Sequence, residues 1–151
     1  MTLVERIDSD IKEAMRARES GKERLAVLRV AKAALKNYEI DLRRPLTDEE
    51  ATEIIAREAK QRREVMPDYE RSGREDLVQR LKQEIEVLLE YLPSQLSEDE
   101  LRRLVEEAVA ASGATGLKDI GRVMGPLMPK VKGRADGKQV NAMVREILQA
   151  R

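Results

Sequence analysis

The sequence predicts an all-α protein in two parts, an N-terminal domain of about four helices followed by a small three-helix C-terminal domain. Three observations support this fold class. Apolar residues make up 41% of the 151 residues, yet Phe and Trp are absent, so the aromatic residues that strands favour are nearly missing. Charged residues make up 38%, a composition typical of solvent-exposed helices. Apolar side chains recur at the three- and four-residue steps of amphipathic helices.

Three capping boxes of the form S/T-x-x-E predict helix starts, at Thr2, Thr47 and Ser97. The first helix is expected to end near Gly21, with an apolar side formed by Leu3, Ile7, Ile11 and Met15. The second is expected over residues 22–42, where a coiled-coil-like seam predicts packing along a neighbouring helix; the seam consists of Leu28, Ala31, Leu35, Tyr38 and Leu42. This second helix is expected to end in the segment 43–45, because Pro45 disfavours the helical conformation of the residue before it.

The third helix is predicted from Asp48 towards Ser72, and Pro67 is expected to kink or interrupt it. A second basic face is one interpretation of this helix, formed by Lys60, Arg62 and Arg63, with Arg74 beyond. The favoured interpretation is that neighbouring acids neutralise these bases by pairing with them along the helix. The fourth helix has the strongest apolar stripe and is expected to stop at Pro93; the stripe is Leu77, Leu81, Ile85, Leu88, Leu89 and Leu92.

The predicted domain boundary lies in residues 91–97, where a proline and a new capping box follow a turn, which divides the chain into domains 1–93 and 94–151. Three amphipathic helices are expected in the second domain. One ends at Ser112-Gly113. The next runs from Leu117 to Met128 and is expected to be interrupted by Gly125-Pro126 and Pro129. The last carries Val140, Met143, Val144, Ile147 and Leu148. Met124 and Met128 are interpreted as core residues.

The absence of two residue types limits the reactions that this chain can catalyse. The chain has neither Cys nor His, which excludes a thiolate nucleophile, a Ser-His-Asp triad and imidazole metal ligands. We therefore expect no catalysis by this chain on its own, no metal and no cofactor. No apolar stretch approaches a membrane span and no signal-peptide core is visible, so a cytoplasmic protein without membrane contact is expected.

Charge is unevenly distributed although 29 bases balance 29 acids. From residue 117 to the end, eight bases stand against three acids. Four of these bases fall in residues 130–138, the predicted basic loop: Lys130, Lys132, Arg134 and Lys138. Gly133 and Gly137 are expected to let a ligand approach the backbone, and the helix that follows is expected to offer free N–H groups to a phosphate. The alternative is an ordinary glycine-capped turn with solvated lysines.

The run GRVMGPLMPKVKGRADGKQVN, together with SGREDL and YLPSQLS upstream, resembles the GatB/YqeY family. Nearly the whole chain resembles YqeY proteins, and chiefly residues 97–151 resemble the tail of the B subunit of the amidotransferases that make Gln-tRNA and Asn-tRNA. This resemblance implies an all-helical fold and a tail that contacts tRNA without doing chemistry. Carried onto this chain, the contacts fall on Lys130, Lys132, Gly133, Arg134 and Lys138. The large catalytic region of the B subunit is absent from this sequence.

The leading hypothesis is a non-catalytic protein that binds tRNA or another structured RNA through the basic loop. All three tyrosines precede the boundary, so the C-terminal part has no aromatic platform for single-stranded bases, and folded RNA is the expected target. One alternative is a protein–protein adaptor that uses the 28–42 seam or a Met-rich groove. Another is an accessory factor of glutamine-dependent tRNA amidation. DNA is not an expected partner.

Overall fold

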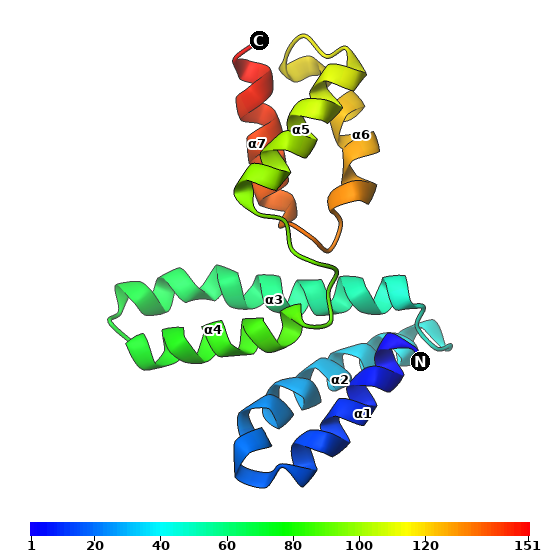
Figure 1. Cartoon of the computed structure of the whole chain (residues 1–151), viewed down its shortest axis with the longest axis vertical. Coiled ribbons are helices and arrows are strands. Elements are labelled where there is room, and N and C mark those ends of the chain that lie inside the picture. The colour runs from blue at the N-terminus through cyan, green and yellow to red at the C-terminus, as the bar shows by residue number, and fades with distance from the viewer. The chain divides into compact units, whose positions relative to one another are not determined.

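The computed structural model describes residues 1–151 and contains seven α-helices, two short 3-10 turns and no strand, which confirms the predicted fold class (Figure 1). The first four helices are α1 (Leu3–Arg16), α2 (Lys22–Leu42), α3 (Asp48–Arg71) and α4 (Glu75–Leu89). The last three are α5 (Glu98–Ser112), α6 (Ile120–Val131) and α7 (Gly137–Gln149). The 3-10 turns are η1 (Arg18–Gly21), ahead of α2, and η2 (Leu117–Asp119), ahead of α6.

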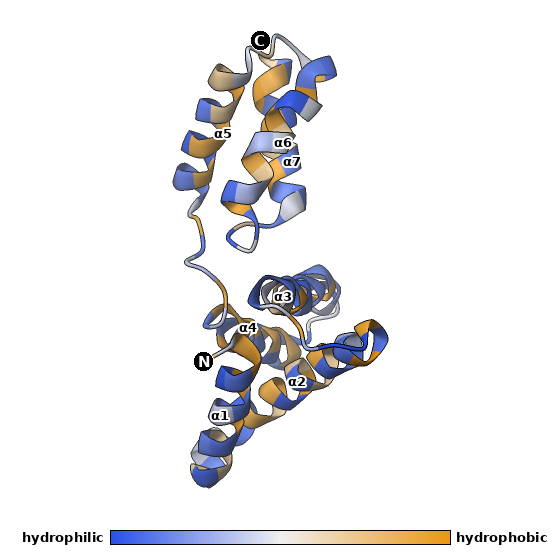
Figure 2. Cartoon of the chain, turned by 90° about the vertical axis from the view of Figure 1, so that its right-hand side faces the viewer, coloured by the Kyte–Doolittle hydropathy of each residue, from blue (hydrophilic) through white to orange (hydrophobic).

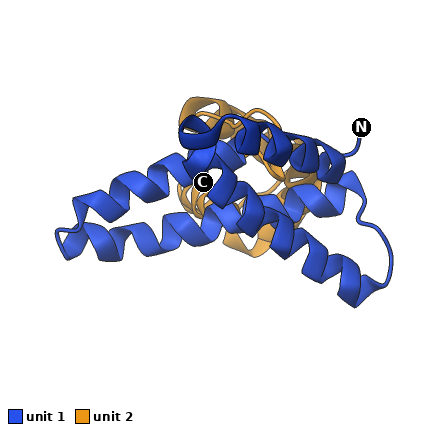
Figure 3. Cartoon of the chain, turned by 90° about the horizontal axis from the view of Figure 1, so that it is seen from below, with its two compact units in different colours: residues 1–92 blue, residues 93–151 orange.

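The chain divides into two compact units, Met1–Leu92 and Pro93–Arg151, which Figure 3 distinguishes by colour. Each unit has its own apolar core. In the first unit, α1 packs beside α2 and α3 packs beside α4, and the most deeply buried side chains are Ile7, Leu28, Leu35, Ile55 and Leu88. In the second unit, the apolar faces of α5, α6 and α7 enclose a separate core around Leu101, Val105, Val123, Leu127, Val144 and Leu148 (Figure 2).

All three predicted capping boxes are present. The side chains of Thr2, Thr47 and Ser97 each accept a hydrogen bond from the backbone N–H three residues on, and the glutamate at that position accepts one from the N–H of the cap residue. Caps of this kind stabilise a helix by about 1 kcal/mol each. Glu50 also receives two hydrogen bonds from Arg44, at 2.8 and 2.9 Å. The Arg44 bonds, more than those from Thr47, lower the pKa of Glu50 to about 2.

The α2 helix begins and ends at the predicted residues, but only part of its predicted seam is buried. Leu28, Ala31 and Leu35 are at most 1% exposed, whereas Tyr38 and Leu42 are 37% and 43% exposed. Three of the five seam residues are thus occupied by packing within the first unit, and the seam is exposed only towards the end of α2. In α1, the helix ends at Arg16, and Ala14 rather than Met15 faces the core.

The expectation that prolines interrupt two helices is wrong. The α3 helix is continuous through Pro67, and α6 is continuous through Pro126 and Pro129. All three prolines are exposed, so the carbonyl groups that lose a helical N–H partner lie on a solvent-facing side where water supplies the missing hydrogen bond.

The α4 helix ends at Leu89, short of the predicted end at Pro93. The next residues form a tighter turn, in which the N–H groups of Glu90, Tyr91 and Leu92 bond to carbonyls three residues back. This turn places the Tyr91 ring in the core, 4% exposed. The phenol donates to Asp10 at 2.5 Å and accepts from Arg24 at 3.0 Å. Burial and the Asp10 hydrogen bond raise the Tyr91 pKa well above its usual value.

Because that phenol joins α1, α2 and the end of α4, Tyr91→Phe is expected to lower the free energy of unfolding of the first unit by about 1–2 kcal/mol. The loss comes from leaving Asp10 and Arg24 without their shared partner. Urea unfolding followed by tyrosine fluorescence measures it, since all tyrosines lie in this unit. Tyr69→Phe is the control, because the Tyr69 hydroxyl makes no hydrogen bond in the structure; an equal loss there would contradict the role of the Tyr91 network.

Candidate nucleic-acid interface

The basic loop, residues 130–138, joins α6 to α7 in the second unit. Val131 ends α6 with its side chain buried, and its carbonyl accepts the N–H groups of Arg134 and Ala135 at 2.9 and 3.1 Å. Gly133 has φ 74°, the left-handed conformation that glycine adopts without strain. Asp136 then caps α7, which begins at Gly137. The chain therefore reverses in a tight turn whose backbone is fixed by hydrogen bonds.

A three-bond clasp holds this loop against residues 94–96 of the same unit. The N–H of Leu96 donates to the Arg134 carbonyl at 2.9 Å, and the Gln95 side chain donates to the Gly133 carbonyl at 2.8 Å. The Nε of Arg134 donates to the Ser94 carbonyl at 3.1 Å. Sequence reasoning missed this clasp, because nothing in the spacing of residues 94–96 shows that they meet a turn about forty residues later.

The structure places the predicted site residues at the end of α6, in the turn that follows it and at the start of α7. Lys130, Lys132 and Lys138 are exposed, and Arg134 is half-buried by its clasp to Ser94. The turn and the two helix ends that it joins therefore carry four cationic side chains on a backbone that is fixed by hydrogen bonds. Such an arrangement suits an extended anion such as a sugar–phosphate backbone, because little ordering remains to be done on binding.

Two details differ from the expectation of a bare helix terminus. The Asp136 carboxylate accepts the N–H of Lys138 at 3.2 Å, so one of the N–H groups expected to face a phosphate is already capped by an acid. The positive φ of Gly133 is by itself a reason for a glycine at this position, so close approach of a ligand is not needed to explain it. Gly137, by contrast, has open space around its Cβ position. The cationic side chains, rather than the axis of α7, are thus the candidate groups for an anion.

The outward face of α6 lies beside the loop and was not predicted as part of the site. Gly121 and Gly125 are exposed, and a Cβ built on either one meets no atom within 4 Å. Close packing against another helix therefore does not explain these glycines. Arg122 and Pro129 share this exposed face, whereas Met124 and Met128 pack against the core as predicted.

In the second possible basic face, Arg62 on α3 and Arg74 beyond it are both paired with acids. Arg62 is bonded to Glu58 and to Glu84 at 2.9 Å each, and Arg74 pairs with Asp76 at 3.3 Å. This bears out the interpretation that acids and bases pair there. The Arg62 side chain is only 13% exposed within its pairs, so its charge is compensated inside the unit, and the exposed Arg74 is paired as well.

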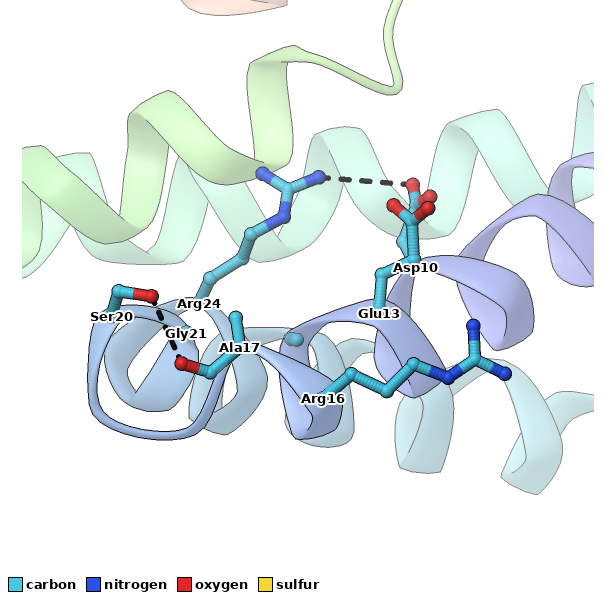
Figure 4. A pocket seen from close by; sticks show the side chains of 8 residues that line it. Asp10, Glu13, Arg16, Ala17, Ser20, Gly21 and Arg24 are labelled. Carbon is cyan, nitrogen blue, oxygen red and sulfur yellow. Dashed lines mark hydrogen bonds and ion pairs between the residues drawn. The ribbon is translucent and has the colours of Figure 1, made fainter.

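A cleft of about 460 Å³ lies beside the α1–α2 turn in the first unit (Figure 4). Its charged lining residues include Asp10, Glu13, Arg16 and Arg24. Asp10 is already engaged by Tyr91 and lies 3.7 Å from Arg24, so its charge is compensated within the protein. The structure contains no group of three or more acidic side chains arranged to hold a metal ion. None of its helices is both long enough and apolar enough to cross a membrane.

Comparison with protein-family models shows the family to which the chain belongs. A family model described as YqeY-like protein matches residues 4–148, nearly the whole chain. The chain therefore belongs to the YqeY-like family, as the motif resemblance indicated.

Individual relatives fall into two groups. Over 150 residues, the chain is 29% identical to "Altered inheritance of mitochondria protein 41, mitochondrial" of Pyrenophora tritici-repentis, covering 97% of this chain and 81% of that protein. Over 58 residues, it is 41% identical to the E subunit of glutamyl-tRNA(Gln) amidotransferase from Thermococcus gammatolerans and 40% identical to that from Thermococcus sibiricus. These matches cover 36% of this chain but only 9% of each amidotransferase chain.

Proposed function

We propose that this protein binds the sugar–phosphate backbone of folded RNA, with tRNA as its principal target, through the basic loop of the second unit. The observation that carries the proposal is the concentration of four bases on one turn whose backbone is fixed by the clasp to residues 94–96. Arg134 keeps guanidinium N–H groups beyond its Nε for a phosphate, and the lysines add positive charge beside it.

The relatives supply the chemical context of the target. Two proteins that share a segment with this chain are named as parts of a glutamyl-tRNA(Gln) amidotransferase. The shared segment is a small part of those proteins, so the chain is proposed to bind RNA without performing amidation. Catalysis by this chain alone is also disfavoured by the absence of His and Cys.

The shape of the RNA, rather than its base sequence, is proposed to determine recognition. The second unit contains no aromatic residue on which unpaired bases could stack. The exposed glycine face of α6 has no side chains at residues 121 and 125 to keep a backbone away. A folded RNA that presents a broad, continuous phosphate surface matches both features better than a flexible strand does.

The experiment is a binding titration of purified total tRNA across a salt series. The logarithm of the association constant is expected to fall linearly with the logarithm of salt concentration, with a slope of about −3 to −4 for the four loop bases. A single-stranded oligo(A) and a DNA duplex are the comparison ligands, and both are expected to bind more weakly. Absence of tRNA binding at about 50 mM salt would rule the proposal out, as would equal affinity for all three polymers.

A further inference from the structure

The outward face of α2 carries an apolar stripe that no other part of the chain covers. It consists of residues at steps of four, three, four and three: Ala26, Val30, Ala33, Asn37 and Ile40. All five are exposed, Val30 by 50% and Ile40 by 63%. The stripe lies opposite the face that buries Leu28, Ala31 and Leu35 in the core of the first unit. This helix is therefore apolar on two sides, of which only one is used within the chain.

The spacing of the stripe is that of a heptad seam. If Val30 and Asn37 are placed at a positions, then Ala26, Ala33 and Ile40 fall at d positions. Asn37 therefore occupies one of the two a positions, and an Asn at an a position fixes register and oligomer state, because the two amides pair across the seam. Small side chains at two of the three d positions allow the helix backbones to approach closely. The stripe thus has the features of a helix–helix interface rather than of a scattered apolar surface.

The charges beside the stripe select the partner and its direction. Lys36 occupies the g position and Asp41 the e position five residues later, and neither makes an ion pair within the chain. In a parallel pair of identical helices, a g residue of one faces the e residue five positions on in the other. Two Lys36–Asp41 pairs therefore form between copies. In an antiparallel pair, the basic flank containing Arg29 and Lys36 faces itself, which is repulsive.

We propose that the chain self-associates into a two-fold symmetric dimer by parallel pairing of the α2 outward faces. The surface is isologous, so the same residues of both copies meet and the assembly closes at two. Because the seam spans only about two heptads, the dimer is weak, with a dissociation constant roughly in the range 10–100 μM. This association is separate from RNA binding, which uses residues of the second unit.

Sedimentation equilibrium of the full-length chain tests the surface. Dimer formation is expected in wild type over the stated concentration range, and Val30→Lys or Ile40→Lys is expected to weaken it at least tenfold. Both positions are exposed, so helix content and unfolding midpoint should be unchanged. The control is Val65→Lys, an apolar residue 42% exposed on α3. A wild type that is monomeric well above 100 μM overturns the proposal, as does a dimer that survives both stripe variants.

A charge exchange tests the direction. Lys36→Asp alone and Asp41→Lys alone each place like charges opposite one another and are expected to weaken the dimer. Mixing the two variants restores opposite charges across the seam, so the mixture should form heterodimers more tightly than either variant pairs with itself. Failure of the mixture to recover affinity overturns the parallel arrangement.

Disulfide trapping gives an independent check, because the natural chain has no cysteine. In a parallel pair, residue 37 faces its own counterpart, so Asn37→Cys is expected to form a covalent dimer under mild oxidation. Ser9→Cys, exposed on α1, is the matched control and should remain monomeric. Equal cross-linking of the two variants, or none at residue 37 in a sample that sediments as a dimer, contradicts the parallel seam.

Discussion

Replacing Lys130, Lys132, Arg134 and Lys138 with alanine is expected to lower the affinity for tRNA roughly 100-fold or more at about 50 mM salt. The physical reason is the release of condensed counterions from phosphates, to which each contacting base contributes about one unit of salt slope. The slope of the variant should therefore be shallower by about three to four units. Binding isotherms over a range of salt concentrations measure both quantities.

The matched control removes the same number of exposed bases elsewhere, at Lys12, Arg16, Lys82 and Arg103. A similar loss of affinity in this control would mean that overall charge, rather than the basic loop, binds the RNA. Arg134 also donates a hydrogen bond to the Ser94 carbonyl, so its loss could disturb the loop itself. A second variant retains Arg134 and changes only the three lysines to glutamine, which tests the effect of charge with the loop structure intact. This variant should still lose most of the salt dependence, while its helix content and unfolding remain those of wild type.

Gly21→Ala is expected to destabilise the first unit by about 3 kcal/mol, which is a large effect for one methyl group. Gly21 ends η1 and is buried where the chain turns from α1 into α2. A Cβ there would lie 2.3 Å from the carbonyl oxygen of Ala14 and 3.0 Å from its carbonyl carbon. Both are backbone atoms, so no rotamer change relieves the clash, and the two helices must separate along their packed faces. Tyrosine fluorescence during urea unfolding isolates the first unit.

Gly121→Ala is the control for this prediction. Its Cβ position is open and its side of α6 is exposed, so alanine should stabilise the second unit by roughly 0.5–1 kcal/mol through the lower entropy of the unfolded chain. The tyrosine transition, which reports the first unit, should not move. An unchanged midpoint in Gly21→Ala would show that α1 and α2 are not packed as tightly as this contact requires.

The helix starts and most helix boundaries were predictable because their signals are local. The side chains of Thr2, Thr47 and Ser97 each accept a hydrogen bond from the N–H three residues on, so the spacing in the sequence is enough to predict the contact. Prolines were misjudged for the opposite reason. Their effect on a helix depends on whether the freed carbonyl faces water, and that depends on burial, which the local sequence does not specify for Pro67 or Pro126.

The missed parts of the molecule depend on contacts between distant segments. The Tyr91 network joins residues more than sixty positions apart, and the clasp on the basic loop joins residues about forty apart. No periodicity encodes either one. The outward stripe of α2 was overlooked because the stronger inward stripe around Leu28 and Leu35 accounts for the same helix. Both stripes are visible in the sequence, but only the exposed fractions of the side chains show that one is unused.

The central claim is that the basic loop of the second unit binds folded RNA. Backbone amide resonances of the full chain, followed by NMR during titration with tRNA, test it most directly, because each amide reports its own surroundings. Perturbed or broadened resonances are expected at residues 130–138, with smaller changes on the exposed face of α6 at Gly121 and Gly125. Perturbations confined to residues 1–92, or none at all at tRNA concentrations that saturate binding, would contradict the claim.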